Sequence, residues 1–136
     1  MSTITPTPVR NTAGETTERF DPVECVDERE RRRAFAAPAG EPGSYLQISG
    51  AERTLMIPLS GEVLRIGRGL ATDLRLDDAS VSRRHALIVR GQGGVRILDD
   101  RSFNGTIVNG HRVDQTDLRS GDVIDVGRVR LRYVEM

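Results

Sequence analysis

From Tyr45 onward the chain is a succession of short β-rich segments separated by Gly, Asn, Asp or Ser, and this pattern constrains the fold most. The segments are YLQIS, TLMIPL, VLRIG, DLRL, ALIVR, VRILD, TIVN, VIDVG and RVRLRYV. In the last, Val129, Leu131 and Tyr133 alternate with arginines, so one face is expected to be buried and the other solvated. Many short strands with turn signals every ~8–12 residues are typical of an all-β sandwich.

Residues 1–43 lack this strand pattern. The opening STITPTPVRNTAGETTERF is rich in Thr and Pro and poor in core-forming residues, which predicts a disordered tail. Acid-before-base pairs at i,i+4 in VECVDERERRRAFAA predict a short surface helix at 23–37, and PAGEP then acts as a linker. We therefore expect a regulatory tail at 1–43 and one folded domain at 44–136.

Composition argues against several functional classes. The 136 residues carry no net charge, and only 4% of them are aromatic, which disfavours nucleic-acid binding. Two histidines and the single Cys25 offer no ligand cluster for a metal and no internal disulfide. No stretch approaches the ~20 apolar residues of a membrane span. We expect a cytoplasmic protein that uses no metal, no cofactor, no nucleic acid and no membrane.

Three stretches between strands are rich in hydrogen-bond donors. They are IGRG, which contains Arg68, SVSRRHA, which begins at Ser80, and DDRSFNGTIVNG, which ends at Gly110. Each has a plain alternative, because an arginine leaving a strand is usually solvated and Asn-Gly is above all a hairpin turn signal. Loops at one end of a sandwich are nevertheless the usual place for function.

Taken together, the three stretches resemble the signature of the forkhead-associated (FHA) domain family. The matching residues, in order, are Gly67, Arg68, Ser82, His85, Asn104, Gly105, Thr106, Asn109 and Gly110. The resemblance covers roughly residues 44–136. It implies a sandwich of about eleven strands whose apical loops bind phosphothreonine peptides, without catalysis.

By this resemblance, Arg68 and Ser82 are the phosphate ligands, and Arg83 occupies a position that often assists. The chemistry agrees, because a phosphothreonine carries about −1.5 to −2 charges and the arginine fork can meet two of its oxygens. Asn104 and Asn109 are expected to bind the peptide main chain, although Asn109 has a turn residue as its alternative. The remaining signature positions shape the loops: Gly67, His85, Gly105, Thr106 and Gly110.

An enzyme is the main alternative from another class. Ser82 and His85, with Asp99 or Asp100, have the residue types of a nucleophile triad. The chain contains no G-x-S-x-G elbow and no obvious oxyanion hole, so we expect no catalytic residues.

The tail adds a second motif. GETTERF, residues 14–20, resembles the E-T-T-x-x-F motif of small actinobacterial FHA regulators of 2-oxoglutarate metabolism. The resemblance implies that a Ser/Thr kinase phosphorylates Thr16 or Thr17, and that the domain then binds its own tail. The expected partners are thus a kinase and either phosphothreonine proteins or the tail. The alternative function is a phosphate-independent module that inhibits or recruits an enzyme.

Overall fold

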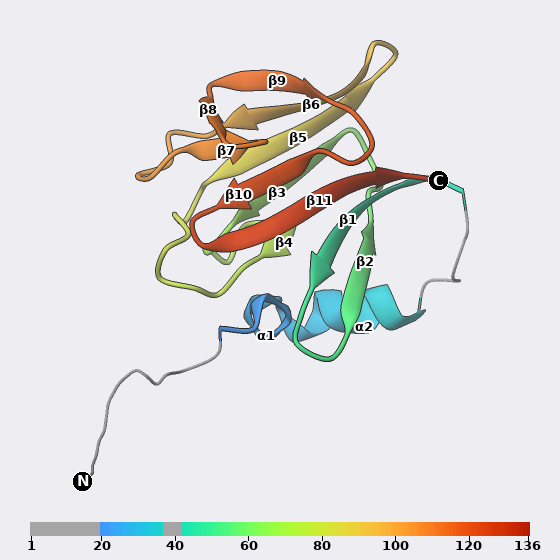
Figure 1. The fold of residues 1–136 in the computed structure, drawn as a ribbon, viewed down its shortest axis with the longest axis vertical. Helices are drawn as coiled ribbons and strands as arrows, with labels where there is room; N and C mark the ends of the chain where they lie inside the picture. The colour runs from blue at the N-terminus through green and yellow to red at the C-terminus, as the bar shows by residue number, and fades with distance from the viewer. Residues whose placement is uncertain (1–19, 37–41) are drawn as a thin grey trace, which may run out of the picture.

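The computed structural model describes residues 20–36 and 42–136, which form a sandwich of two β-sheets with two helices at one end (Figure 1). Within these residues the eleven strands are β1 Ser44–Ser49, β2 Thr54–Pro58, β3 Val63–Gly67, β4 Leu74–Arg75, β5 Ala86–Gly91, β6 Gly94–Asp99, β7 Thr106–Val108, β8 His111–Val113, β9 Gln115–Leu118, β10 Val123–Val126 and β11 Val129–Glu135. The expectation of an all-β sandwich is confirmed.

The strands divide into a six-stranded sheet, ordered β2-β1-β11-β10-β7-β8, and a five-stranded sheet, ordered β4-β3-β5-β6-β9. The β3–β4 pair is parallel, and the other named pairs are antiparallel. Apolar side chains from the inner faces of both sheets fill the core, among them Leu46, Ile66, Ile88, Ile97, Ile124 and Leu131. Strands of two to seven residues suffice here because the two sheets bury their inner faces against each other.

Strand β11 follows the predicted alternation. Val129, Leu131 and Tyr133 are fully buried, whereas the intervening arginines are exposed. Arg130 forms an ion pair with Asp125 of β10, with 2.8 Å between Nε and Oδ1. Arg130 and Arg132 therefore form a solvated strand face, and both bond to groups inside the domain.

The N-terminal segment differs from the single helix expected at 23–37. It forms α1 Pro22–Cys25 and α2 Glu28–Ala36, which are separated by extended backbone at Val26. The break has a tertiary cause, because residues 25–27 hydrogen-bond to the end of β4. The Asp27 N–H donates to the Arg75 carbonyl at 3.1 Å, and the Asp77 N–H donates to the Cys25 carbonyl at 2.7 Å.

This segment belongs to the folded unit. Val23 and Val26 join the hydrophobic core, with 0% and 2% of their surface exposed. A Cβ at Gly50 would lie 2.6 Å from Val23 Cγ2, so glycine makes room for α1 against the β1–β2 turn. The core therefore reaches beyond the expected boundary at Ser44. Thr16 and Thr17 lie outside the described residues, and none of the helices described is long and apolar enough to cross a membrane.

Candidate functional site

Three loops meet at one end of the sandwich. Ser82, in the second of them, contacts both of the others. The loops are 68–73 between β3 and β4, 76–85 between β4 and β5, and 100–105 between β6 and β7. The Arg68 N–H donates to the Ser82 carbonyl at 2.9 Å, and the Phe103 N–H donates to Ser82 Oγ at 2.9 Å. The donor-rich stretches that the sequence separates are thus joined in space.

Glycine at position 67 permits this close approach. A Cβ built on Gly67 would lie 2.2 Å from the Arg83 carbonyl oxygen, well inside van der Waals contact. The next glycine, Gly69, donates its N–H to the same carbonyl at 3.0 Å. The first two loops are therefore packed backbone against backbone.

The Arg68 side chain is held by its inner nitrogen. Nε donates to the Val81 carbonyl at 2.9 Å, while Arg75 Nε donates to the Arg68 carbonyl at 2.9 Å. Among the described residues, no hydrogen bond or ion pair engages the two terminal guanidinium nitrogens of Arg68. This arrangement fixes the fork in one direction and leaves its outer edge available to an anion.

Ser82 has a similar division of roles. Because its Oγ already accepts a hydrogen bond from Phe103, the hydroxyl proton is directed elsewhere and can be donated to a ligand. The side chain of Arg83 is exposed beside it, whereas Arg84 makes two 3.1 Å bonds to the Asp100 carboxylate. The two neighbouring arginines therefore differ, and Arg84 is already paired.

His85 is fully buried and connects two of the loops. Its Nδ1 accepts the Ser82 N–H at 3.1 Å, so the ring proton resides on Nε2, which donates to the Gly105 carbonyl at 2.9 Å. Neither ring nitrogen of His85 hydrogen-bonds to the Ser82 hydroxyl. The geometry is that of a brace between backbones and not of a base activating a nucleophile.

Asp99 organises the third loop, a role that the sequence analysis did not assign. Its carboxylate accepts the Ser102 N–H at 3.1 Å, the Ser102 hydroxyl, and the hydroxyl of the buried Thr106 at 2.7 Å. Burial raises the pKa of Asp99, but the hydrogen bonds from Ser102 and Thr106 outweigh it, so the pKa is lowered. The D-x-x-S sequence, typical of a side-chain-capped turn, is the signal that could have revealed this.

The two candidate asparagines lie at opposite ends of β7. Asn104 is exposed at the loop tip, and its Nδ2 lies 3.5 Å from the Ser80 carbonyl. Asn109 and Gly110 have φ of 50° and 85°, as a two-residue hairpin turn requires. The Asn109 amide donates to Asp122 Oδ1 at 3.0 Å and accepts the Val123 N–H at 2.9 Å. These contacts fit the alternative in which Asn109 is a turn residue.

Neither the nucleophile triad nor a cluster of metal ligands is assembled in the described residues. The Asp99 carboxylate is hydrogen-bonded by Ser102 and Thr106, and Asp100 is paired with Arg84, while the ring nitrogens of His85 bond to backbone groups. In the part of the chain that is described, no three His, Cys, Asp or Glu side chains gather closely enough to hold a metal ion. The site is a surface cradle of donors with a rigid backbone behind it.

Comparison with known proteins agrees with this architecture. The FHA domain family matches residues 64–127. The oxoglutarate dehydrogenase inhibitor of Corynebacterium jeikeium is 35% identical over 105 residues, covering 73% of each chain. The glycogen accumulation regulator GarA of Mycobacterium tuberculosis is 35% identical over 95 residues, covering 68% of this chain and 59% of GarA.

Solved structures give the same answer. One, described as an analysis of phosphothreonine-dependent FHA domain interactions, has a TM-score of 0.61 at 35% identity and covers 68% of this chain and 96% of that one. Mycobacterium tuberculosis EmbR, in complex with a low-affinity phosphopeptide, has a TM-score of 0.63 at 31% identity and covers 76% of this chain and 27% of EmbR. The chain belongs to the FHA domain family.

The relatives include small actinobacterial regulators, as the sequence resemblance implied. The chain spans only about half of several of them, 48% of the Corynebacterium diphtheriae oxoglutarate dehydrogenase inhibitor and 43% of GarA from Mycolicibacterium smegmatis. The activities of those whole proteins can therefore only be proposed for this chain.

Proposed function

We propose that the protein binds phosphothreonine peptides in bacterial Ser/Thr kinase signalling, with Arg68, Ser82 and Arg83 on the phosphate and Asn104 on the peptide main chain. The observation that carries this is the junction at Ser82, whose carbonyl and hydroxyl oxygens are held by the Arg68 and Phe103 amides. Donors fixed in this way need little reordering when an anion binds, so less binding energy is lost.

Exposed apolar side chains flank the cradle on two sides. Leu70, in the β3–β4 loop, and Phe103, in the β6–β7 loop, each expose 88% of their surface. Large apolar side chains so exposed beside a polar site are typical of contact surfaces. We propose that Leu70 and Phe103 contact the peptide residues that flank the phosphothreonine.

The test is titration calorimetry of the full chain with a phosphothreonine peptide and its unphosphorylated twin. Arg68→Ala removes a two-pronged charged contact, and losing even one such bond costs roughly 1.5–3 kcal/mol, or about 10- to 100-fold in affinity. Arg84→Ala is the matched control, since it removes the same charge from an arginine already paired with Asp100. Equal affinity for the two peptides, or equal loss in both variants, contradicts the proposal.

A second candidate function is phosphate-independent inhibition or recruitment of an enzyme. It is favoured by the likeness to proteins named oxoglutarate dehydrogenase inhibitor. A pull-down with the unphosphorylated full chain and its Arg68→Ala variant separates the two functions. Capture of a partner that survives Arg68→Ala supports this second function, because only phosphate recognition needs the arginine fork.

We further propose that the tail, once phosphorylated on Thr16 or Thr17, competes for the same site. Phe20 already lies on the domain, and three residues of chain from Thr17 span at most about 11 Å. If this tether spans the distance to the cradle, it gives an effective concentration of about millimolar, enough to fill a micromolar site.

Competition decides whether the tail is a ligand. The stoichiometrically phosphorylated full chain is titrated with a phosphothreonine peptide that binds the unphosphorylated protein. We expect a marked loss of affinity, which the combined substitution Thr16→Ala and Thr17→Ala abolishes after the same kinase treatment. Undiminished affinity of the phosphorylated chain means that the tail is not a ligand.

A further inference from the structure

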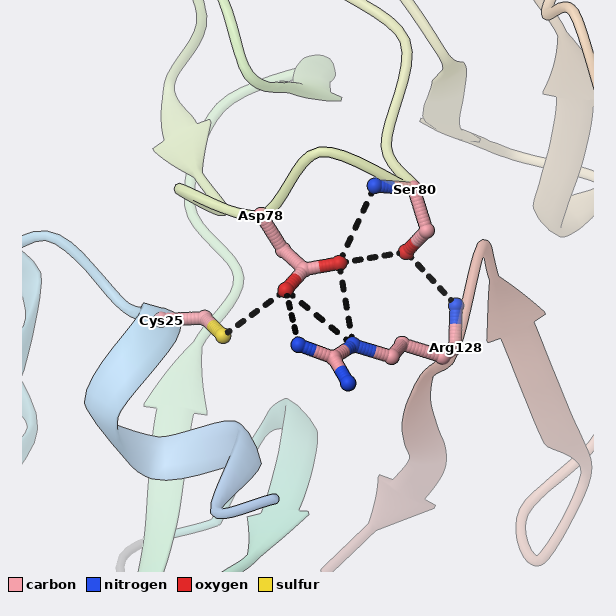
Figure 2. Close-up of polar contacts among 4 residues, drawn as sticks. All are labelled: Cys25, Asp78, Ser80 and Arg128. Carbon is pink, nitrogen blue, oxygen red and sulfur yellow. Dashed lines mark hydrogen bonds and ion pairs between the residues drawn. The ribbon is translucent and has the colours of Figure 1, made fainter. Parts of the chain in front are cut away.

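A cluster of side chains joins the N-terminal segment to the loop that carries Ser82 (Figure 2). We call it the clasp, and it consists of Phe20, Cys25, Asp78, Ser80 and Arg128. Its members come from three places: the N-terminal segment, the β4–β5 loop and the β10–β11 turn. None of them belongs to the phosphate cradle described above.

Asp78 is the centre of the clasp. Its side chain is 9% exposed, and its carboxylate accepts bonds both from the β10–β11 turn and from its own loop. Arg128 of the turn makes bonds of 2.8–3.2 Å through Nε and Nη2. Within the loop, Ser80 donates its N–H at 3.0 Å and its hydroxyl at 2.5 Å. The bonds from Arg128 and Ser80 lower the pKa of Asp78 to about 2, against the opposing effect of burial.

The β10–β11 turn is pressed onto the same serine. The Arg128 N–H donates to Ser80 Oγ at 2.9 Å, and a Cβ at Gly127 would lie 2.4 Å from both the carbonyl oxygen and Oγ of Ser80. Ser80 precedes Ser82 by two residues, and its carbonyl lies 3.5 Å from Asn104 Nδ2. Ser80, which the clasp holds in place, is therefore connected to Ser82 through the chain and to Asn104 through its carbonyl.

The N-terminal segment contributes Phe20 and Cys25, which contact Arg128 and Asp78. The guanidinium carbon of Arg128 lies 3.8 Å from the centre of the Phe20 ring, a cation–π contact. The Cys25 thiol contacts Asp78 Oδ1 at 4.0 Å, and burial together with the Asp78 charge raises its pKa, so the thiol stays protonated as a weak donor. Val23 and Val26 anchor the segment in the core, which keeps Phe20 and Cys25 in place.

We infer that residues 20–26 are a working part of the recognition site: through Arg128 and Asp78 they set the conformation of loop 76–85 and hence the affinity of the site for phosphothreonine. Phe20, Asp78 and Arg128 are thus positioning residues that touch no ligand. The inference rests on the proposed phosphothreonine function for its affinity readout only. If the inference holds, a molecule that contacts residues 20–26 changes phosphothreonine affinity without entering the phosphate cradle.

The test uses full-chain variants Phe20→Leu, Phe20→Tyr, Asp78→Asn and Arg128→Gln. Arg130→Gln is the matched control, since Arg130 lies two residues further along, on β11, and forms an ion pair of the same length outside the clasp. Two quantities are measured: affinity for a phosphothreonine peptide, and hydrogen exchange at the Ser80 and Ser82 amides of the free protein. Thermal unfolding shows that each variant is folded.

We expect Asp78→Asn and Arg128→Gln to weaken peptide affinity about tenfold and to speed exchange at both amides, as coupled neighbours do. Phe20→Leu should weaken affinity by about two- to fivefold, the value of an exposed cation–π contact, and Phe20→Tyr should restore it. A purely structural apolar contact predicts instead that leucine substitutes as well as tyrosine, and that outcome overturns the inference.

Two further outcomes also overturn it: wild-type affinity and exchange in Asp78→Asn and Arg128→Gln, or equal losses in Arg130→Gln. The exchange measurement keeps the two proposals separable. If the wild-type chain binds no phosphothreonine peptide, the proposed function fails, while unchanged exchange in the clasp variants would refute the clasp by itself.

Discussion

Replacing His85 by leucine is the sharpest test of how the recognition loops are held together. The imidazole is fully buried and forms two hydrogen bonds, from the Ser82 amide at 3.1 Å and to the Gly105 carbonyl at 2.9 Å. Leucine fills a similar volume but can make neither bond. The substitution therefore leaves one donor and one acceptor buried on two different loops.

The cost follows from those two groups. Each buried polar group left without a partner costs about 1–3 kcal/mol, so the pair costs about 2–6 kcal/mol. The apolar surface of leucine offsets about 1–2 kcal/mol of this. The difference spans about 0–5 kcal/mol, and we expect a net loss near its middle, about 2–3 kcal/mol in the free energy of unfolding, which leaves a domain of ordinary stability folded. Because Ser82 loses its backbone restraint, phosphothreonine affinity should fall at least as sharply.

Urea unfolding and peptide titration of the full chain measure both effects. His111→Leu is the control, since His111 is the second histidine of the chain and is exposed on β8. A loss below about 0.5 kcal/mol, the usual range for surface changes, would show that the brace contributes nothing. So would a loss equal to that of the control.

Three other substitutions test separate parts of the structure. Gly67→Ala should cost about 1–3 kcal/mol in unfolding free energy, as overpacking does, and weaken peptide binding, whereas Gly93→Ala, in open space, should not. Phe103→Ala should weaken peptide binding in calorimetry while changing stability by less than about 0.5 kcal/mol, because the ring is exposed. Since the pKa of Asp78 is lowered to about 2, its stabilising effect is complete above its ordinary pKa and is lost as pH falls from about 4 to about 2. The difference in unfolding free energy between wild type and Asp78→Asn should shrink over that range, and a constant difference would contradict the assignment.

The strands differ in how readily the sequence predicts them. Long alternation makes β11 plain, and the apolar residues of β5 and β6 identify the centre of the five-stranded sheet. Strands β8 and β9 were not predicted individually. They read HRV and QTDL, three and four mostly polar residues at the sheet edges, where one neighbouring strand suffices to define them. Such strands are determined by their partners and not by their own pattern.

The site shows the same division. Arg68, Ser82 and Asn104 could be predicted as candidate site residues because a family pattern fixes their order, and the structure brings their loops together. Their support could not be assigned in this way. Whether an arginine is available or paired depends on a carboxylate elsewhere in the chain, as the contact between Arg84 and Asp100 illustrates. Spacing along the sequence contains no information on such pairs.

The N-terminal segment shows why the domain boundary was the hardest feature to predict. Val23 and Val26 are isolated apolar residues in a charged stretch, so neither a helical nor a strand period marks them for burial. Their burial depends on complementary surface far along the chain, including the space left at Gly50 and the end of β4 beside Val26. The segment also lies outside residues 64–127, where the family pattern applies. The contact of Phe20 with Arg128 joins residues on either side of that range, and by our inference it places control of the recognition site in a part of the sequence that the family pattern does not describe.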